Sequence, residues 1–393
     1  MLNIIFKNSC RLDSESKLND KSDSPMAQVR PSNRLRWIDQ ERGFVMFLLL
    51  LTITFPPNEW MPGGSILFWF FGHPDSQATY MTLFDVGAAV FIFIIGLSFS
   101  ISFHRRIATQ GLHKAVLHVL TRYGMILILG LLFLLASAGS YNILEYRSTF
   151  GITVVRWDVI PTLGAVGFVT LPFIFITNPK IRMILAYGWM ILYQILMIFA
   201  GLKTYAQASV HGGFFGTIFG FSGIMIVATA LGDYIFHSPT RERRKYSYMM
   251  VFGAINILGG LVLSFLPGWE AAKRQVSFSY CLISIGVTIF CSLVFVYLDR
   301  VKNLELKYFQ ALGRNPFLTY LTAETLPLIL DETIGNDLGM GPLGNVLVTL
   351  VTLIYTSILM WYLYKKNTIV STIKATFLFI LIGIVLALFL MLR

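Results

Sequence analysis

The residue types best suited to proton transfer gather in one short polar stretch that contains His73, Asp75 and Asp85. An imidazole titrates near neutral pH, so His73 can act as a general base or carry an acyl group, and Asp85 or Asp75 can orient it. Ionisable residues beside membrane helices are functional candidates. The alternative is a solvated loop with an incidental histidine and an aspartate that caps a helix, and the sequence leaves both open.

The elements that must position these residues are membrane helices. Of the 393 residues, 55% are apolar and only 13% are charged, and the mean hydropathy is +0.69. A soluble domain has about 25% charged residues. Apolar segments of about 18 residues or more, each sufficient to cross about 30 Å of hydrocarbon, recur along the chain. The composition therefore predicts an all-α, polytopic transmembrane helical bundle in a lipid bilayer.

We predict eleven spans, at about residues 38–55, 79–103, 117–138, 158–177, 181–200, 212–236, 246–266, 276–298, 309–330, 342–364 and 369–391. With a cytosolic N-terminus, the inner segments hold 23 of the 31 Lys and Arg residues and the outer segments hold 6. This is the distribution that the positive-inside rule requires. The C-terminus and His73 are then expected outside. Residues 1–33 read as a disordered polar arm, and 34–393 as the membrane domain.

The positive-inside rule also explains the net charge of +11 without a nucleic-acid partner. The three cysteines, Cys10, Cys281 and Cys291, have no paired spacing, so we expect neither a disulfide scaffold nor a metal site. In a bacterium this composition predicts an inner-membrane or plasma-membrane protein.

Arginines at the inner ends of two spans are candidates for binding a phosphate-bearing cofactor. Arg36 and Arg42 open the first span, and a guanidinium fork suits phosphate. The alternative for Arg42 is a simple ion pair with Asp39, one helical turn away. Arg314 and Asn315 open the ninth span, where a helix terminus can bind an anion. The other basic clusters at this end, 104–106 and 241–245, are interpreted as topology-setting charge.

Three charged residues near the outer face are candidates for the acceptor side. Asp158 precedes the fourth span, where a helix cap explains it without any function. Lys273, before the eighth span, could stabilise a developing oxyanion. Glu324 lies within the ninth span, where a carboxylate needs a partner inside the bundle.

Five short motifs carry a resemblance to a known family. They are RWIDQERG at 36–43, His73 and Asp85 with FIFIIGLS at 91–98, GFFGTI at 213–218 with Leu231-Gly232, KRQVSFSY at 273–280, and GRNPFLTY at 313–320 with Glu324. In this order they resemble the heparan-α-glucosaminide N-acetyltransferase family and its bacterial relatives among multi-pass acyltransferases. The chain departs from the family pattern after His73, where Pro-Asp-Ser-Gln-Ala follows, and at Ile160-Pro161.

The resemblance implies transfer of an acetyl group from cytosolic acetyl-CoA to an amino sugar or another glycan component on the outer side. His73 and Asp85 would be catalytic, and no metal is expected. A homodimer is left open. The alternative is a multi-pass transporter or flippase in which Glu324 lines a path. The scarcity of charge within the spans favours the enzyme. The expected binding residues are Arg36, Arg42, Arg314 and Asn315 for acetyl-CoA and Asp158, Lys273 and Glu324 for the acceptor.

Overall fold

The computed structural model describes residues 35–54, 68, 72, 80–137, 143–330 and 341–391. The predicted arm at 1–33, together with His73 and Asp75, lies outside the described residues.

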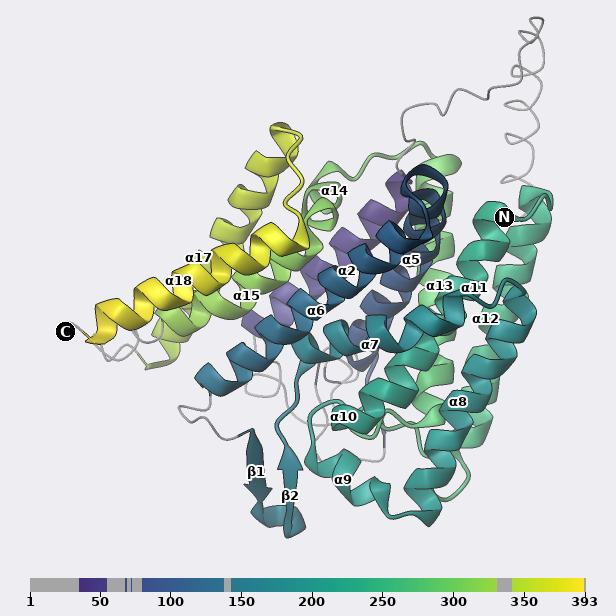
Figure 1. Cartoon of the computed structure of the whole chain (residues 1–393), viewed down its shortest axis with the longest axis horizontal. Helices are drawn as coiled ribbons and strands as arrows, with labels where there is room; N and C mark the ends of the chain where they lie inside the picture. The colour runs from purple at the N-terminus through teal and green to yellow at the C-terminus, as the bar shows by residue number, and fades with distance from the viewer. Residues whose placement is uncertain are drawn as a thin grey trace, which may run out of the picture.

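Helices form nearly all of the described chain (Figure 1). The first half contains α2 (Arg36–Thr54), the 3-10 turn η1 (Phe84–Val86) that leads into α5 (Gly87–Gln110), α6 (Leu112–Ser137), α7 (Val159–Ile174), α8 (Pro179–Phe199), α9 (Leu202–Ala208), α10 (Gly213–Phe215) and the π-helical segment η3 (Gly216–Phe221). The second half contains α11 (Ser222–His237), α12 (Glu242–Ser264), α13 (Phe278–Arg300), α14 (Lys307–Arg314), α15 (Pro316–Leu330), α17 (Gly341–Lys365) and α18 (Thr372–Met391).

An antiparallel hairpin is the exception to the all-helical prediction. Strand β1 (Leu144–Arg147) pairs with β2 (Ile152–Val155), with Leu144 opposite Val155. The connection contains a 3-10 turn (Ser148–Phe150) and Gly151, whose φ of 65° a glycine adopts without steric cost. The hairpin lies beside α9 at one end of the bundle (Figure 1).

The predicted all-α helical bundle is confirmed, because helices form nearly all of the described chain. Within the described residues, seven helices are long and apolar enough to cross a membrane. These are 84–110, 112–135, 179–199, 213–237, 242–264, 278–300 and 346–365. The apolar parts of α7 and α18 that the structure describes are shorter.

Small residues allow the helices to approach closely. In Figure 1, α2 and α5 occupy the middle, α8, α11, α12 and α13 lie to one side, and α17 and α18 lean away on the other. Helix α12 packs closely on α13 at two glycines. A Cβ at Gly260 would lie 2.8 Å from the carbonyl oxygen of Ser279, and one at Gly286 would lie 2.6 Å from that of Gly253, so neither position has room for a side chain. Such contacts drive helix association where lipid removes the hydrophobic driving force.

The contact between α2 and α14 joins two of the sequence motifs. A Cβ at Gly43 would overlap the carbonyl oxygen of Phe309, and one at Gly313 would overlap that of Asp39. The glycines that follow Arg42 and precede Arg314 are therefore needed for backbone-to-backbone packing.

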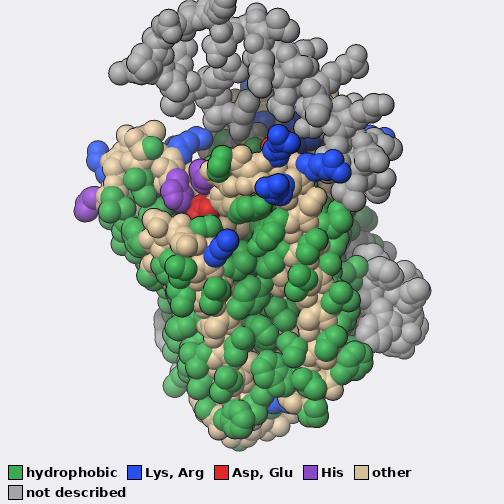
Figure 2. Space-filling model, turned by 90° about the vertical axis from the view of Figure 1, so that its right-hand side faces the viewer, with side chains coloured by type: hydrophobic (Ala, Val, Ile, Leu, Met, Phe, Trp, Pro, Cys, Tyr) green, Lys and Arg blue, Asp and Glu red, His purple; other side chains and the backbone are tan. Residues whose placement is uncertain are grey.

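The two ends of the bundle differ in charge. Figure 2 shows a broad hydrophobic face with Lys and Arg side chains gathered toward its upper end. Helix α14 lies toward this end in Figure 1, and the hairpin lies at the opposite end. The asymmetry is the one that the Lys and Arg count predicts.

Candidate functional site

One cavity brings together four of the predicted site residues. It has a volume of about 560 Å³, and its polar lining includes Asp85, Asp158, Lys273 and Glu324. The rest of its wall is largely apolar and comes from α2, α5, α7 and α13. This size and an apolar lining with a few convergent polar groups are typical of small-molecule sites. We call it the outer cavity, after the side on which the Lys and Arg count of the sequence predicts Asp158 and Lys273 to lie.

Asp85 and Lys273 form an ion pair in its wall. The Lys273 Nζ lies 3.1 Å from Asp85 Oδ1, and the Asp85 side chain is fully buried whereas that of Lys273 is 21% exposed. The backbone N–H of Thr82 donates to Asp85 Oδ2 at 2.8 Å, and the Tyr280 hydroxyl donates to the Asp85 carbonyl oxygen at 2.9 Å. A buried carboxylate needs this compensation, since isolated burial of a charge is costly.

The same aspartate is linked to the polypeptide next to His73. The Thr82 hydroxyl donates to the carbonyl oxygen of Gly72 at 2.6 Å, while the Thr82 backbone N–H binds Asp85. The backbone position immediately before His73 is therefore two hydrogen bonds from the Asp85 carboxylate.

Asp158 and Glu324 are two further acidic residues in the lining of the outer cavity. Asp158 is the N-cap of α7 and accepts from the Val159 N–H at 2.7 Å, as predicted for a helix cap. The Tyr320 hydroxyl, one helical turn from Glu324 on α15, hydrogen-bonds to the Glu324 carboxylate. The predicted partner inside the bundle is therefore a tyrosine of the same helix. Asp158 also interacts electrostatically with Glu324, so the two carboxyl groups lie near each other in the cavity.

His211 is a residue of the outer cavity to which the sequence assigned no role. It begins three consecutive residues with positive φ, His211 (51°), Gly212 (70°) and Gly213 (60°). Positive φ at a residue other than glycine costs about 1–2 kcal/mol and is concentrated at functional sites. The two glycines after His211 are the signal that could have identified it.

A second strained turn packs against the first. Val276, a β-branched residue, has a φ of 52°, which is an outlier for its type. A Cβ at Gly212 would lie 2.9 Å from Val276 Cγ2 and 3.2 Å from the Gln275 carbonyl oxygen. The two turns therefore fix each other, and they present His211 and Lys273 to the same cavity.

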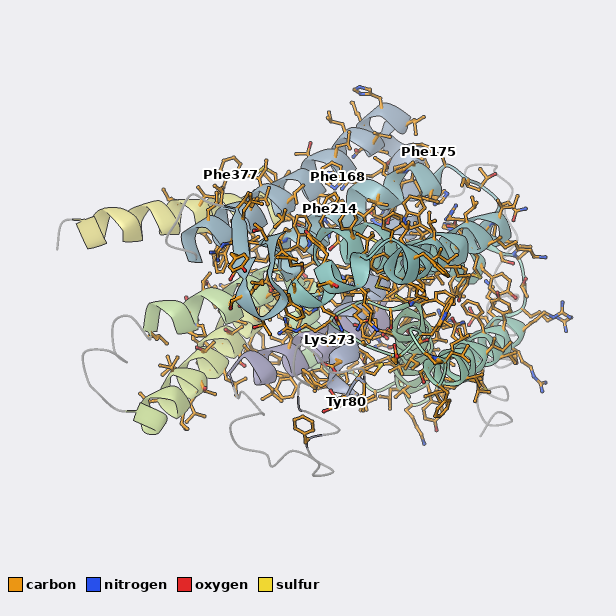
Figure 3. The ribbon with its side chains drawn as sticks, turned by 90° about the horizontal axis from the view of Figure 1, so that it is seen from below. Tyr80, Phe168, Phe175, Phe214, Lys273 and Phe377 are labelled. Carbon is orange, nitrogen blue, oxygen red and sulfur yellow. The ribbon has the colours of Figure 1, made fainter. Side chains whose placement is uncertain are left out.

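Helix α8 holds the turn that carries Lys273. The Tyr193 hydroxyl donates to the Gln275 carbonyl oxygen at 3.0 Å, and the Gln194 side chain bridges the Gly268 carbonyl oxygen (2.6 Å) and the Phe278 N–H (2.8 Å). Viewed from below in Figure 3, Lys273 lies in the middle of the bundle. These hydrogen bonds from α8 fix the loop that carries Lys273.

Glu270 anchors the same loop. It accepts from the Gly268 N–H at 3.0 Å, and its carboxylate lies 3.8 Å from Lys203 Nζ. Partial burial raises the pKa of Glu270, but the hydrogen bonds from the Gly268 and Glu270 N–H groups and the Lys203 charge outweigh it. The pKa of Glu270 therefore lies below its ordinary value.

Three of the four predicted cofactor residues bind other parts of the protein. Arg36 donates to Asp299 and to Glu305, both at 2.5 Å. Arg314 donates to Asn367 at 3.0 Å, and its guanidinium lies 4.5 Å from the centre of the Tyr364 ring. Asn315 donates to the Thr368 carbonyl oxygen (3.2 Å) and accepts from the Val370 N–H (2.8 Å). These contacts give all three a structural role at the Lys- and Arg-rich end of the bundle.

Arg42 lines a second cavity, of about 110 Å³, which we call the inner cavity. It donates to the Ser98 hydroxyl at 2.9 Å and lies 3.6 Å from the Asp39 carboxylate, so the ion pair predicted as its alternative is present. Arg122 of α6, for which no role was predicted, lines the same cavity. Two guanidinium groups in one recess can hold a phosphate-bearing cofactor.

The two cavities share wall residues. Phe91 of α5 and Leu163 of α7 line both the outer and the inner cavity. Asp85, Asp158, Lys273 and Glu324 are thus on one side of this shared wall, and the arginine pair is on the other. Comparison of the chain with protein-family models and with curated proteins gives no significant match.

Proposed function

We propose that this protein is a membrane acetyltransferase. It moves an acetyl group from acetyl-CoA, bound at the inner cavity, to an amino sugar or another glycan component in the outer cavity. The observation that carries the proposal is the shared wall of Phe91 and Leu163 between a recess with two arginines and a larger cavity with four charged residues. An extended donor with a phosphate end and an acyl-thioester end matches this division of charge.

The topology belongs to the same proposal. Eleven crossings with a cytosolic N-terminus and an outer C-terminus place Arg42 toward the inside and Lys273 toward the outside. The Lys and Arg side chains at one end of the bundle support this orientation (Figure 2).

The chemistry needs a base, an oxyanion partner and a leaving thiolate. His73 takes the proton from the acceptor amine or hydroxyl as the acceptor nitrogen or oxygen attacks the thioester carbonyl. In this proposal Asp85 orients the imidazole of His73. The C–S bond then breaks, and the CoA thiolate leaves with the proton that His73 accepted. Lys273 donates to the developing oxyanion while it stays paired with Asp85. In a second route His73 itself carries the acetyl group between donor and acceptor.

His211 and the two carboxylates complete the acceptor side. His211 is a second imidazole of the cavity and can shuttle the released proton. Asp158 and Glu324 suit hydroxyl and amine groups, because carboxyl oxygens accept hydrogen bonds from both.

Binding of the donor tests the inner half of the proposal. Acetyl-CoA is titrated into purified protein in detergent, and Arg42→Gln and Arg122→Gln are compared with wild type. Loss of one charged hydrogen bond to phosphate, about 1.5–3 kcal/mol, weakens binding by roughly 10- to 100-fold. Arg147→Gln, at the opposite end in the hairpin and paired with Glu145, is the matched control and should bind normally. Equal affinities in all four proteins would refute the inner site.

Turnover tests the outer half. CoA release is followed with acetyl-CoA and a panel of amino sugars, using wild type and His73→Ala. Sugar-dependent release that is lost in the variant, with acetyl-CoA affinity intact, supports the proposal. Solute uptake by vesicles containing the protein, without CoA release, would instead favour the transporter.

A further inference from the structure

Two histidines and an aspartate form a cluster at the Lys- and Arg-rich end of the bundle, away from both cavities. His104 is on α5, and Asp233 and His237 are on α11. One ligand atom from each residue lies within 4.8 Å of those of the other two, and the two imidazole ring centres are 5.0 Å apart. Figure 2 shows histidine and acidic side chains close together near this end of the hydrophobic face.

The helix contact that creates the cluster is close and well defined. A Cβ at Gly96 would lie 2.8 Å from the Met225 carbonyl oxygen, and one at Gly232 would lie 3.2 Å from that of Leu97. The small residues therefore hold α5 against α11 without large side chains between them. His104 and His237 each project from this contact near the end of their helix.

The spacing suits a tetrahedral metal ion. His237 Nδ1 lies 3.3 Å from Asp233 Oδ1. Ligands at about 2.0–2.1 Å from a tetrahedral zinc ion are about 3.3–3.4 Å apart, so this pair already has the separation of two metal ligands. The set of two imidazoles and one carboxylate favours zinc and its neighbours among the divalent transition metals.

Surrounding groups orient the ligands as they do in known metal sites. His104 Nδ1 lies 3.6 Å from Asp233 Oδ1 and 2.9 Å from the Ser100 carbonyl oxygen, and these contacts hold the imidazole ring beside the carboxylate. The Ser100 hydroxyl and Arg182 donate to the two oxygens of Asp233.

Arg182 fixes the position of this carboxylate. It is fully buried, lies 2.7 Å from Asp233, and also donates to the carbonyl oxygens of Ile174 and Ile176. The His104 and His237 side chains are 42% and 45% exposed, so an ion can enter from water.

The geometry points to a divalent transition-metal site formed by His104, Asp233 and His237, with Zn²⁺ as its representative ion. Three protein ligands leave the fourth tetrahedral position to water. The bound ion joins the ends of α5 and α11. It acts as a clamp remote from Asp85, which lies in the 3-10 turn before the opposite end of α5.

The experiment uses the full-length protein, purified in detergent with a tag that contains no histidine and stripped with a chelator. Zn²⁺ alone is titrated by calorimetry, and Co²⁺ is added separately because its visible absorption reports tetrahedral coordination. The variants are His104→Gln and His237→Gln, both at half-exposed positions that tolerate substitution. His113→Gln is the matched control, since His113 is an exposed histidine at the start of α6.

We expect one Zn²⁺ per chain in wild type and in His113→Gln, with tetrahedral Co²⁺ spectra and a higher thermal midpoint when Zn²⁺ is present. Each ligand variant should bind at least tenfold more weakly, because even loss of an outer-shell partner costs about 10- to 100-fold. Two results would overturn the site: no wild-type binding tighter than about 100 μM, or equal losses in His113→Gln and the ligand variants. If a lower pH stabilises the metal-free protein while Zn²⁺ does not bind, the cluster is an ion-pair network. That result would also overturn the metal site.

Discussion

The ion pair between Asp85 and Lys273 allows a sharp test of how the outer cavity is built. Lys273→Met removes the positive charge beside the fully buried Asp85 carboxylate. That carboxylate still accepts a hydrogen bond from the Thr82 N–H at 2.8 Å. Removing one partner of a buried ion pair costs about 3–5 kcal/mol. Because that hydrogen bond stays, we expect the low end of this range, about 3 kcal/mol.

The reverse change should cost less. In Asp85→Asn the amide oxygen can still accept from Thr82, and Lys273 is 21% exposed to the cavity, where water can solvate it. We expect about 1–2 kcal/mol, the size of one hydrogen bond with a charged group. The double variant has no stranded charge, so its cost should fall below the sum of the two single costs by about 1.5 kcal/mol or more.

The assay is reversible unfolding in mixed micelles with a denaturing detergent, followed by circular dichroism. Lys203→Met is the matched control, because this outer lysine is 37% exposed and lies 3.8 Å from Glu270. A surface pair of this kind contributes about 1 kcal/mol or less. Costs for the two single variants that simply add, within about 0.5 kcal/mol, would show that the residues are not energetically paired and would refute the reasoning.

Three further predictions concern packing, the inner loop and pH. Gly313→Ala should lower stability by about 3 kcal/mol or more in the same unfolding assay because its Cβ would overlap the Asp39 carbonyl oxygen, whereas Gly188→Ala, with open space around it, should be neutral or slightly stabilising. Asn315→Ala should cost about 1–3 kcal/mol through loss of two hydrogen bonds to the loop between α17 and α18, and unchanged protease sensitivity of that loop would contradict its role. The pKa of Glu270 is below its ordinary value in the folded protein, so its stabilisation is present above the unfolded pKa of about 4.3 and is lost as pH falls below it. The thermal midpoint of wild type should therefore fall more steeply than that of Glu270→Gln between about pH 5 and pH 3, and parallel curves would count against the shift.

The sequence by itself determined the membrane class and the positions of the helices. Apolar length and the Lys and Arg distribution report the thickness and charge asymmetry of the membrane, and both are properties of local composition. The helix cap at Asp158 was also predictable, since a cap needs only its neighbouring backbone. The β1–β2 hairpin was not predicted, because short strands between spans carry a weak pattern.

Only the tertiary structure decided which polar residues share a site. Asp85 and Lys273 are far apart in the chain and meet because two turns with positive φ, at His211 and Val276, pack against each other. Arg122 joins Arg42 in one recess, while Arg36 is bound by two acidic side chains. Residue type predicts which groups can be ionised. Which of them meet across a cavity depends on helix packing, and in this protein that packing is set by backbone contacts at glycine, as between Gly43 and α14.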